Sequence, residues 1–582
     1  MLFKRTILLI ATAAVLSSGV DAQRSAPGGG ARAIDPASLR EWLAYIASDE
    51  LQGREVYTEG LGLAASFIAR HLRDWGVRPA GDDGTYFQTV KVLGVRNTGK
   101  SSVTIDVNGR RQTFADGDAI VLPANVGTRR VLTADDVLFV GYGAEIRSAG
   151  IDDYKSVDFA GKVVVWLGSQ GPRDAGEDSY RLFAARTRAA IEKGAIAVVH
   201  PPYSASSAAR GANPPGNPDE PASAGEDGRQ QLRTGRRGRN PGTTVDFTVA
   251  GRFDVPVPPS VTAHDNFFEF LFSGAEVPYS RLNELAAERA PLPHFALTGV
   301  TLTFNISPEY SVVSTRLTRN VVGTVPGTDP KLKDTYVTFG AHYDHIGYES
   351  SGRASSFGNF GCPGQSRPEP RPGDIINNGA DDDGTGTVAL MAIARAFARG
   401  ARPRRSLAFV WHTAEESGLL GSRYNADYPV VPNDKIIAQL NVDMIGRNRC
   451  DNAGEANTVY LVGSDRISTD LHNLSEDVNA SLPRPMTLDY ELNDPADPQS
   501  LYTRSDHYSY AEKGIPVIFY TTGLHRDYHF LTDEVDNIEW NKLARVTQLI
   551  YATGQRLANL QHAPARDNRG PRVGKERGGK IK

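Results

Sequence analysis

Residues 379–386 read GADDDGTG, which places three aspartates side by side between glycines. Adjacent carboxylates repel one another, so this arrangement needs hydrogen-bond donors or positive charge close by. Taken alone, the segment has two interpretations: it either caps a helix, whose N-terminus favours acidic side chains, or helps to bind a cation. A calcium loop of the EF-hand type is excluded, because its spacing would make Gly379 the first ligand and Leu390 the twelfth.

Four short apolar segments elsewhere in the chain are predicted strands, and each leads into a potential ligand. They are TYVTFGAH (335–342), RSLAFVWH (405–412), IIAQLNV (436–442) and IPVIFYTTG (515–523). Uninterrupted, partly β-branched runs of this kind are typical of strands buried on both faces. The residues at or beyond their ends are His342 for the first, Glu415 and Glu416 for the second, Asp443 for the third and His529 for the fourth. Because sites in open α/β sheets form at the carboxyl ends of strands, we expect these side chains to meet at one edge, beside the aspartates.

Carboxylates crowded together with two imidazoles indicate a site for divalent cations. Each residue alone has an ordinary explanation: His342 as a hydrogen-bonded core residue, and Glu415 and Glu416 as a solvated pair. Together they favour metal binding, because two Zn²⁺ ions would keep the carboxylates ionised. One aspartate can bridge two metals about 3.5–4 Å apart, and the flanking glycines allow the sharp turn that this requires.

Other protein classes lack their signatures in this chain. There is no H-E-x-x-H segment and no serine within G-x-S-x-G, which argues against proteases of the first type and against a nucleophile elbow. A formal net charge of −4 over 582 residues argues against a nucleic-acid-binding protein, which would carry a basic excess.

Six segments resemble the motifs of the M28 family of co-catalytic zinc exopeptidases, and they occur in the family's order. They are AHYDH, NNGADDDGTG, TAEESGLLGS, NVDMIG, RSDHYSYAEKGIPVIF and DYHFLTDEVDNI. The resemblance covers about residues 35–125 and 300–560. It implies the zinc exopeptidase fold, an α/β domain with a mostly parallel mixed sheet flanked by helices, in agreement with the alternation of predicted strands and helices.

The resemblance also implies a role for each candidate residue. Five of them would bind two zinc ions: His342 and Asp443 one ion, Glu416 and His529 the other, and Asp382 both. Glu415 would be the general base and acid, since it lies beside a ligand without being one. Three further residues would support the metals or the substrate: Asp344 by accepting the other ring N–H of His342, Asp383 by supporting the bridging loop, and Tyr528 by hydrogen bonding to an oxyanion or by packing.

The implied protein is an exported dizinc aminopeptidase that removes N-terminal residues from peptides. A carboxypeptidase or dipeptidase of the same fold is an alternative, because Arg504 and Arg526 near the motifs could bind a terminal carboxylate. A single-zinc acyltransferase related to glutaminyl cyclases is another, although the presence of both His342 and Asp382 argues against it. A receptor-like relative without activity is disfavoured by the complete ligand set.

The N-terminal segment has the layout of a secretory signal. Lys4 and Arg5 precede an apolar run over 7–16, and cleavage is expected after Ala22, which makes 1–22 the signal. The run is too short to span a membrane, which takes about 20 residues. We therefore expect a periplasmic or secreted protein without a membrane anchor.

A second domain is expected within the peptidase domain, at residues 130–295. GYGAE, DFAGKVVVWLG and AIEKGAIAVVH make this insertion similar to a protease-associated (PA) domain, a smaller β-rich α/β fold that either contributes to the site or is a spectator. Its Pro-, Gly- and Arg-rich stretch 203–245 is predicted to be disordered, as is the basic tail 563–582. The two cysteines, Cys362 and Cys450, are compatible with one disulfide beside the metal edge or with two free thiols.

Overall fold

The computed structural model describes residues 30–570 except 147–149, 156, 169–170, 176–179, 203–244, 250–252, 254, 350–361, 363–364, 496 and 498. The predicted signal segment 1–22 and nearly all of the predicted loop 203–245 therefore lie outside the described residues. Within the described part of the chain, no helix combines the length and the apolar character needed to cross a membrane.

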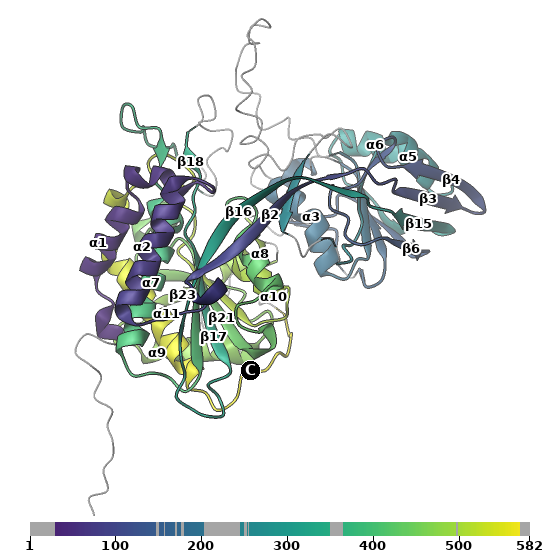
Figure 1. The fold of residues 1–582 in the computed structure, drawn as a ribbon. Helices are drawn as coiled ribbons and strands as arrows, with labels where there is room; N and C mark the ends of the chain where they lie inside the picture. Colours follow the sequence, from purple (N-terminus) through teal and green to yellow (C-terminus); the bar gives the residue numbers. More distant parts are fainter. Residues whose placement is uncertain are drawn as a thin grey trace, which may run out of the picture.

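A ten-stranded mixed sheet forms the centre of the larger domain (Figure 1). Its four middle strands are parallel neighbours, in the order β20 (Ser406–His412), β17 (Tyr336–His342), β21 (Ile436–Val442) and β24 (Val517–Thr521). These are the four strands predicted from the sequence. The sheet continues beyond β20 with β16 (Tyr310–Val325), β2 (Phe87–Asn97), β12 (Asp246–Val249) and β1 (Arg78–Pro79), and beyond β24 with β22 (Thr458–Val462) and β23 (Thr487–Asp489).

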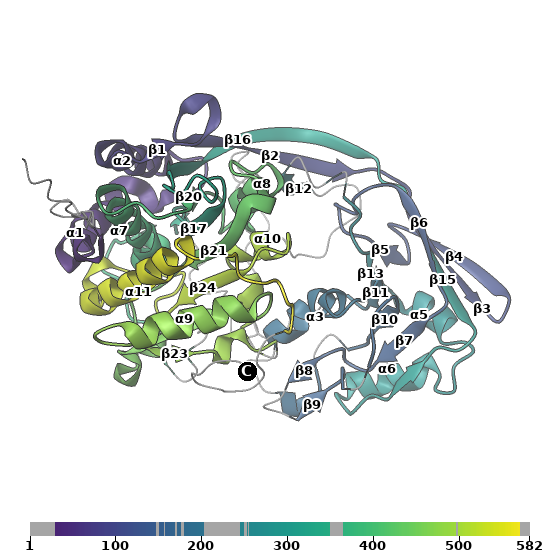
Figure 2. The same ribbon diagram turned by 90° about the horizontal axis from the view of Figure 1, so that it is seen from below.

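Helices cover both faces of this sheet, which explains why its middle strands are apolar without alternation. Successive residues of β20 point to opposite faces: Phe409 belongs to the main core, whereas Ala408 packs in a second cluster with Tyr510. The helices on the main-core face are α1 (Pro36–Ile46), α2 (Glu59–Trp75), α7 (Gly386–Arg399), α9 (Thr469–Ser481) and α11 (Trp540–Ala558). On the other face, α8 (Leu420–Asp427) packs against α10 (His507–Ala511) (Figure 2).

A long antiparallel ribbon of β2 and β16 joins the large sheet to the inserted domain (Figures 1 and 2). That domain contains an antiparallel sheet of β4 (Arg110–Ala115), β3 (Ser102–Val107), β15 (Val300–Ile306) and β6 (Arg130–Ala134). Its second sheet consists of β14 (His294–Ala296), β7 (Val137–Val140), β10 (Val163–Val165), β11 (Ala197–His200), β13 (Ser260–Ala263) and β5 (Ile120–Val121). Its helices are α3 (Tyr180–Glu192), α5 (Asp265–Leu271) and α6 (Tyr279–Ala287). Two short strand pairs complete the described strands: β8 (Glu145–Ile146) with β9 (Ile151–Asp152), and β18 (Gly347–Tyr348) with β19 (Ile376–Asn377).

The inserted domain is wider in the structure than the predicted range 130–295. Strands β3 and β15, which the sequence analysis assigned to the peptidase domain, pair with each other, and β15 also pairs with β6. Val103 and Leu302 share a hydrophobic core with Phe139. The insertion therefore begins after β2 and ends before β16.

Part of the predicted C-terminal tail is ordered. Within 563–570, the main-chain N–H of Ala565 donates to Asp470 (2.9 Å), and Asp567 accepts a hydrogen bond from the N–H of Thr469 (3.1 Å). These contacts fix the segment to the start of α9, which the basic composition of the tail did not indicate. Residues 571–582 lie outside the described residues.

Candidate active site

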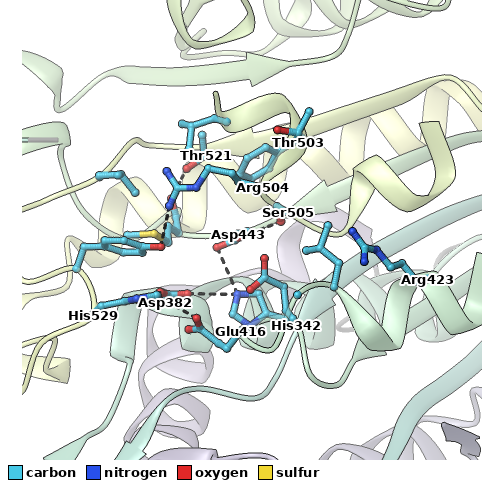
Figure 3. Close-up of a pocket in the computed structure, with 18 of the residues that line it drawn as sticks. His342, Asp382, Glu416, Arg423, Asp443, Thr503, Arg504, Ser505, Thr521 and His529 are labelled. Atoms are coloured by element: carbon cyan, nitrogen blue, oxygen red, sulfur yellow. Dashed lines mark hydrogen bonds and ion pairs between the residues drawn. The ribbon is translucent and has the colours of Figure 1, made fainter. Parts of the chain in front are cut away.

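The predicted ligands meet at the carboxyl ends of the parallel strands, as expected from the sequence. His342 is the last residue of β17, Asp443 directly follows β21, and Glu416 lies shortly beyond β20. Asp382 lies in the segment Ala380–Thr385, which directly precedes α7, and His529 lies in the segment after β24. Figure 3 shows these five side chains turned toward one another.

Asp382 lies between two groups of potential ligands. Its Oδ1 is 3.2 Å from Nε2 of His342, and its Oδ2 is 3.1 Å from Nε2 of His529. Asp443 completes the first group, with Oδ1 3.7 Å from His342 Nε2, and Glu416 completes the second, with Oε2 3.0 Å from His529 Nε2. Two ligand atoms bound to one tetrahedral zinc ion lie about 3.3 Å from each other, because each zinc–ligand bond is about 2.0–2.1 Å long. Both groups therefore have the spacing that a shared cation requires.

Some oxygens in these groups are buried without a well-aligned hydrogen bond. Among the described residues, Oδ2 of Asp382 and Oε1 of Glu416 lack such a partner, although imidazole nitrogens lie close to both. Buried carboxylate oxygens normally find a hydrogen-bond donor, so this pattern is the one expected where lone pairs of oxygen and nitrogen point to a common cation. The residues present thus fit divalent cations with carboxylate and imidazole ligands.

Protons on the histidines balance these carboxylates when no cation is bound. Burial alone would lower the pKa of His529, but the charge of Glu416 raises it to about 9. Burial alone would raise the pKa of Asp382, but hydrogen bonds from His342 and His529 hold it well below its ordinary value. A divalent cation would replace these protons, so metal binding releases protons and weakens at low pH.

Glu415 lines the same pocket and belongs to neither ligand group. Burial raises its pKa well above the ordinary value; the charge of His342 opposes this rise, and the charge of Glu416 adds to it. A partly buried glutamate whose pKa is raised in this way is suited to proton exchange with a substrate. The role that the resemblance implies for Glu415 stays a prediction.

The structure corrects the contact expected for Asp344. Nδ1 of His342 lies 3.1 Å from the main-chain carbonyl oxygen of Asp344, but 3.9 Å from its carboxylate. The carboxylate instead accepts hydrogen bonds from the main-chain N–H groups of Glu415 (3.1 Å) and Glu416 (3.4 Å). Asp344 therefore orients His342 through its backbone, and its side chain positions the segment that carries the two glutamates.

Asp383 joins three segments beneath the site. Its Oδ2 accepts a hydrogen bond from the main-chain N–H of His342 (3.2 Å), and its Oδ1 accepts from those of Gly386 (2.9 Å) and Met444 (3.2 Å). The start of α7 is thus tied to the ends of β17 and β21. This geometry agrees with the supporting role expected for Asp383.

Two residues without an assigned role in the sequence analysis hold the chain around Asp382. Asp533 accepts hydrogen bonds from the main-chain N–H groups of Asp381 (3.0 Å) and Asp382 (3.1 Å). Arg54, at the end of the short helix η2 (Asp49–Arg54), is fully buried and donates to the carbonyl oxygens of Gly379 (2.9 Å) and Asp382 (3.5 Å). Its other acceptors are the carbonyl oxygens of Ile46, Tyr343 and Asn378. Arg54 thus binds the carbonyl groups, and Asp533 the N–H groups, of the loop that presents Asp382.

His345 is a third imidazole in the site, and the sequence analysis assigned it no role although it belongs to the AHYDH motif. Its Nδ1 lies 2.8 Å from Oε1 of Glu416 and 3.9 Å from Oδ2 of Asp382. The buried ring meets that of His529 edge-on, with centroids 5.7 Å apart. Gly379 leaves room for it: φ is +56°, and a Cβ there would lie 2.5 Å from the ring of His345. His345, Asp382 and Glu416 therefore form a further possible ligand set.

The candidate ligands open into a cavity of about 240 Å³. Tyr528 lines this cavity; its ring stacks on His529 at 3.9 Å, and its hydroxyl accepts a hydrogen bond from Arg504 (3.0 Å). Arg188 of α3 also lines it and donates to the carbonyl oxygen of Thr503 (3.1 Å). The inserted domain therefore forms part of the pocket wall.

Cys362 and Cys450 form a disulfide, with Cα atoms 5.2 Å apart. The main-chain N–H of Cys450 donates to the carbonyl oxygen of Leu524 (2.9 Å), and Leu524 lines the cavity. The bridge thus stabilises a segment at the border of the pocket, as the sequence analysis proposed for a bonded pair.

Known proteins are similar to the part of the chain that carries this site. Residues 320–554 match the model of Peptidase family M28, and this range contains Glu415 and all five predicted ligands. This part of the chain is therefore similar to the M28 peptidases.

Characterised relatives are similar over part of their length. Leupeptin-inactivating enzyme 1 of Streptomyces exfoliatus is 32% identical over 148 residues, which is 25% of this chain and 30% of that protein. Aminopeptidase Y of Saccharomyces cerevisiae is 28% identical over 246 residues, which is 40% of this chain and 37% of that protein. The matched stretches thus span about a third of the length of these relatives.

Among solved structures, an aminopeptidase from Aneurinibacillus sp. strain AM-1 aligns with a TM-score of 0.43 and 16% identity over 95% of this chain and 100% of that one. The zinc aminopeptidase BSAP from Bacillus subtilis aligns with a TM-score of 0.41 and 16% identity over 92% of this chain and 98% of that one.

Proposed function

We propose that this protein is an exported aminopeptidase that uses two zinc ions to hydrolyse the N-terminal residues of peptides. The observation that supports this most directly is the position of Asp382, whose two oxygens face imidazoles of separate ligand groups, those of His342 and His529. A carboxylate in this position can bridge two cations about 3.5–4 Å apart, the arrangement of two-metal aminopeptidases. The match to Peptidase family M28 agrees with this reaction.

In this proposal each predicted residue keeps a defined task. The zinc ligands would be His342 and Asp443 for one ion, Glu416 and His529 for the other, and Asp382 for both. Zinc at such a site supplies Lewis acidity, which lowers the pKa of water to about 7 and polarises a carbonyl group.

The side chains of the protein transfer the proton and stabilise the new charge. Glu415 removes a proton from the attacking water and later transfers it to the nitrogen of the leaving amine. Asp344 holds the main chain of Glu415 in place, and Asp383 supports the loop of the bridging aspartate. Tyr528 lines the cavity, and its hydroxyl, which accepts a hydrogen bond from Arg504, would donate to the oxyanion that develops on the substrate carbonyl.

A carboxypeptidase or dipeptidase reaction is a second candidate, because Arg504 lines the pocket. Arg526, the other arginine considered from the sequence, pairs with Asp451 at 3.1 Å and lies outside the lining of this pocket. Aminoacyl anilides compared with N-blocked dipeptides distinguish the two reactions. Cleavage of the blocked dipeptides alone would favour the second candidate, and one zinc ion per chain would favour the cyclase-like acyltransferase.

Glu415→Gln tests the proposed mechanism. General acid–base catalysis contributes about 10²–10⁴-fold to a rate, so kcat on a leucyl anilide should fall by that factor while zinc content stays the same. Glu284→Gln, which changes an exposed glutamate of α6, is the matched control. Full activity of the zinc-loaded Glu415→Gln protein would remove Glu415 from the mechanism.

Export is proposed on two grounds. Residues 1–22 have the layout of a secretory signal, and the disulfide between Cys362 and Cys450 is a bond that persists in oxidising compartments.

The similarity of the inserted domain to PA domains also remains a proposal, and the position of Arg188 in the pocket lining supports a contribution of this domain to substrate binding.

A further inference from the structure

Three arginines line the cavity that holds the candidate metal ligands. Arg188 comes from α3 of the inserted domain, Arg423 from α8, and Arg504 from the end of η13 (Leu501–Thr503). In Figure 3, Arg423 and Arg504 lie on opposite sides of the cluster formed by His342, Asp382, Glu416 and Asp443. The walls of the cavity therefore carry positive charge around an acidic centre.

Arg504 is held close to the reacting atoms. It donates to the hydroxyl of Tyr528 (3.0 Å) and to the carbonyl oxygen of Gln499 (3.3 Å). Tyr528 in turn stacks on His529, with ring centroids 3.9 Å apart. Tyr528 is thus the one residue that lies between Arg504 and the candidate ligand His529, so a substrate group bound to Arg504 lies close to the metal ligands.

Arg188 is fixed to the rim of the peptidase domain. It donates to the carbonyl oxygen of Thr503 (3.1 Å), and its guanidinium carbon lies 5.3 Å from the centroid of the Tyr508 ring. One turn further along α3, Glu192 accepts a hydrogen bond from the hydroxyl of Tyr508 (3.1 Å). These contacts hold a cationic side chain of the inserted domain at the pocket. Figure 2 shows the helix α3 that carries it on the side of the inserted domain that faces the peptidase domain.

The charges of the pocket favour an anionic substrate group once the metals are bound. The carboxylates that line it are those of Asp382, Glu415, Glu416 and Asp443. Two divalent cations would balance these four negative charges, and the cationic side chains of the lining are then the three arginines, of which Arg504 also interacts with the buried Asp497. Leu419, Leu501, Phe519 and Leu524 supply apolar wall between them, which suits a carboxylate carried on a short aliphatic stem.

We propose that the pocket selects peptides that present a carboxylate to one of the arginines Arg188, Arg423 and Arg504, either from an acidic side chain or from the C-terminus of a short peptide. This inference rests on the proposed peptidase function and names the class of its substrates. Guanidinium groups bind carboxylates through paired, charge-assisted hydrogen bonds, which gives both affinity and orientation.

Three matched pairs of peptides test this selectivity on the zinc-loaded full chain. Leu-Ala against Leu-Ala-amide probes a terminal carboxylate, Glu-anilide against Gln-anilide probes the residue removed, and Leu-Glu-amide against Leu-Gln-amide probes the next residue. We expect kcat/KM to be about tenfold or more higher for the charged member of at least one pair, the effect of one charge-assisted hydrogen bond. The pair that responds identifies the source of the carboxylate.

Single variants Arg188→Met, Arg423→Met and Arg504→Met then assign the effect. The charged-to-neutral ratio of the responding pair should fall at least threefold in one or more of them, and this ratio is insensitive to partial misfolding because both substrates meet the same enzyme. Arg526→Met, outside the pocket lining, should retain the wild-type ratio. Ratios near one in all three wild-type pairs, or a ratio preserved in all three variants, would overturn the inference while leaving the peptidase intact. Absence of any hydrolysis would overturn the proposed function and this inference with it.

Discussion

Oδ2 of Asp382 lies 3.1 Å from Nε2 of His529. Because Oδ1 of the same aspartate is 3.2 Å from Nε2 of His342, one carboxylate contacts both ligand groups. Arg54 and Asp533 fix the main chain of this loop from two sides, so the carboxylate is held in its place before any metal arrives. Binding at the two cation positions should therefore depend on a single side chain.

Asp382→Asn should remove zinc from both positions. The amide has one oxygen to offer where the carboxylate has two, and it lacks the charge that balances the cations. Zinc measured by elemental analysis after dialysis should fall from two ions per chain to less than one. Asp536→Asn, which alters an exposed aspartate, serves as the control and should keep both ions. Two ions retained by the Asp382→Asn protein would show that Asp382 is not the bridging ligand.

His345→Gln should lower the affinity of the protein for one zinc ion more than for the other. Its Nδ1 is 2.8 Å from Oε1 of Glu416, a ligand predicted for the ion near His529. Removing a partner that orients a ligand costs about 10–100-fold in metal affinity. Competition with a chromophoric chelator should show this loss for one ion and wild-type affinity for the other, and the exposed His562 provides a matched substitution to Gln. Equal affinities in variant and wild type would exclude His345 from the metal site.

Arg54→Lys should destabilise the loop that presents Asp382. The guanidinium donates to five main-chain carbonyl oxygens, and an ammonium group with three N–H groups cannot replace this pattern. Because the position is fully buried, we expect a loss of at least about 3 kcal/mol in the free energy of unfolding. Chemical denaturation measures the loss, and Arg70→Lys, at a side chain that is 73% exposed, should change the stability by less than about 0.5 kcal/mol. A small loss of stability in the Arg54→Lys protein would contradict the role of Arg54 in holding the loop that presents Asp382.

His507 should make the fold sensitive to acid. Burial lowers its pKa to about 3, and its ring stacks on Phe519 with centroids 4.8 Å apart. Below the ordinary histidine pKa of about 6.5, the unfolded chain binds a proton that the folded chain does not, so the free energy of unfolding falls as pH decreases. Between pH 7 and pH 5 this residue alone should account for a loss of about 2 kcal/mol.

The comparison of His507→Phe with wild type isolates this contribution. Phenylalanine keeps the stacking and does not titrate, so the loss of stability between pH 7 and pH 5 should be smaller by about 2 kcal/mol in urea denaturation. His562→Phe changes an exposed histidine and should retain the wild-type dependence on pH. Identical pH dependence in His507→Phe and wild type would contradict the account.

The sequence predicted the parts of the site that lie on strong local patterns. The strands β17, β20, β21 and β24 are uninterrupted apolar runs, and the topology of a parallel sheet brings their ends together. His342, Glu416 and Asp443 follow from this rule because each lies at or just beyond a strand end.

The rest of the site depends on contacts that no local pattern records. Arg54 lies 328 residues from Asp382, and its role follows from where the loop carbonyls point. The family resemblance implied a contact between the Asp344 carboxylate and His342, but this carboxylate accepts hydrogen bonds from the N–H groups beyond β20. The boundary of the insertion in the structure differs from the predicted one because the sequences of β3 and β15 are those of ordinary short strands. The pairing of β15 with β3 and with β6 assigns them to the inserted domain.

Anomalous diffraction at the zinc edge from crystals of the zinc-loaded protein tests the central claim most directly. We predict two peaks about 3.5–4 Å apart. One should lie among Asp382 Oδ1, His342 and Asp443, and the other among Asp382 Oδ2, His529 and Glu416. A single peak, or no peak beside Asp382 at saturating zinc, would contradict the two-metal site and the mechanism built on it.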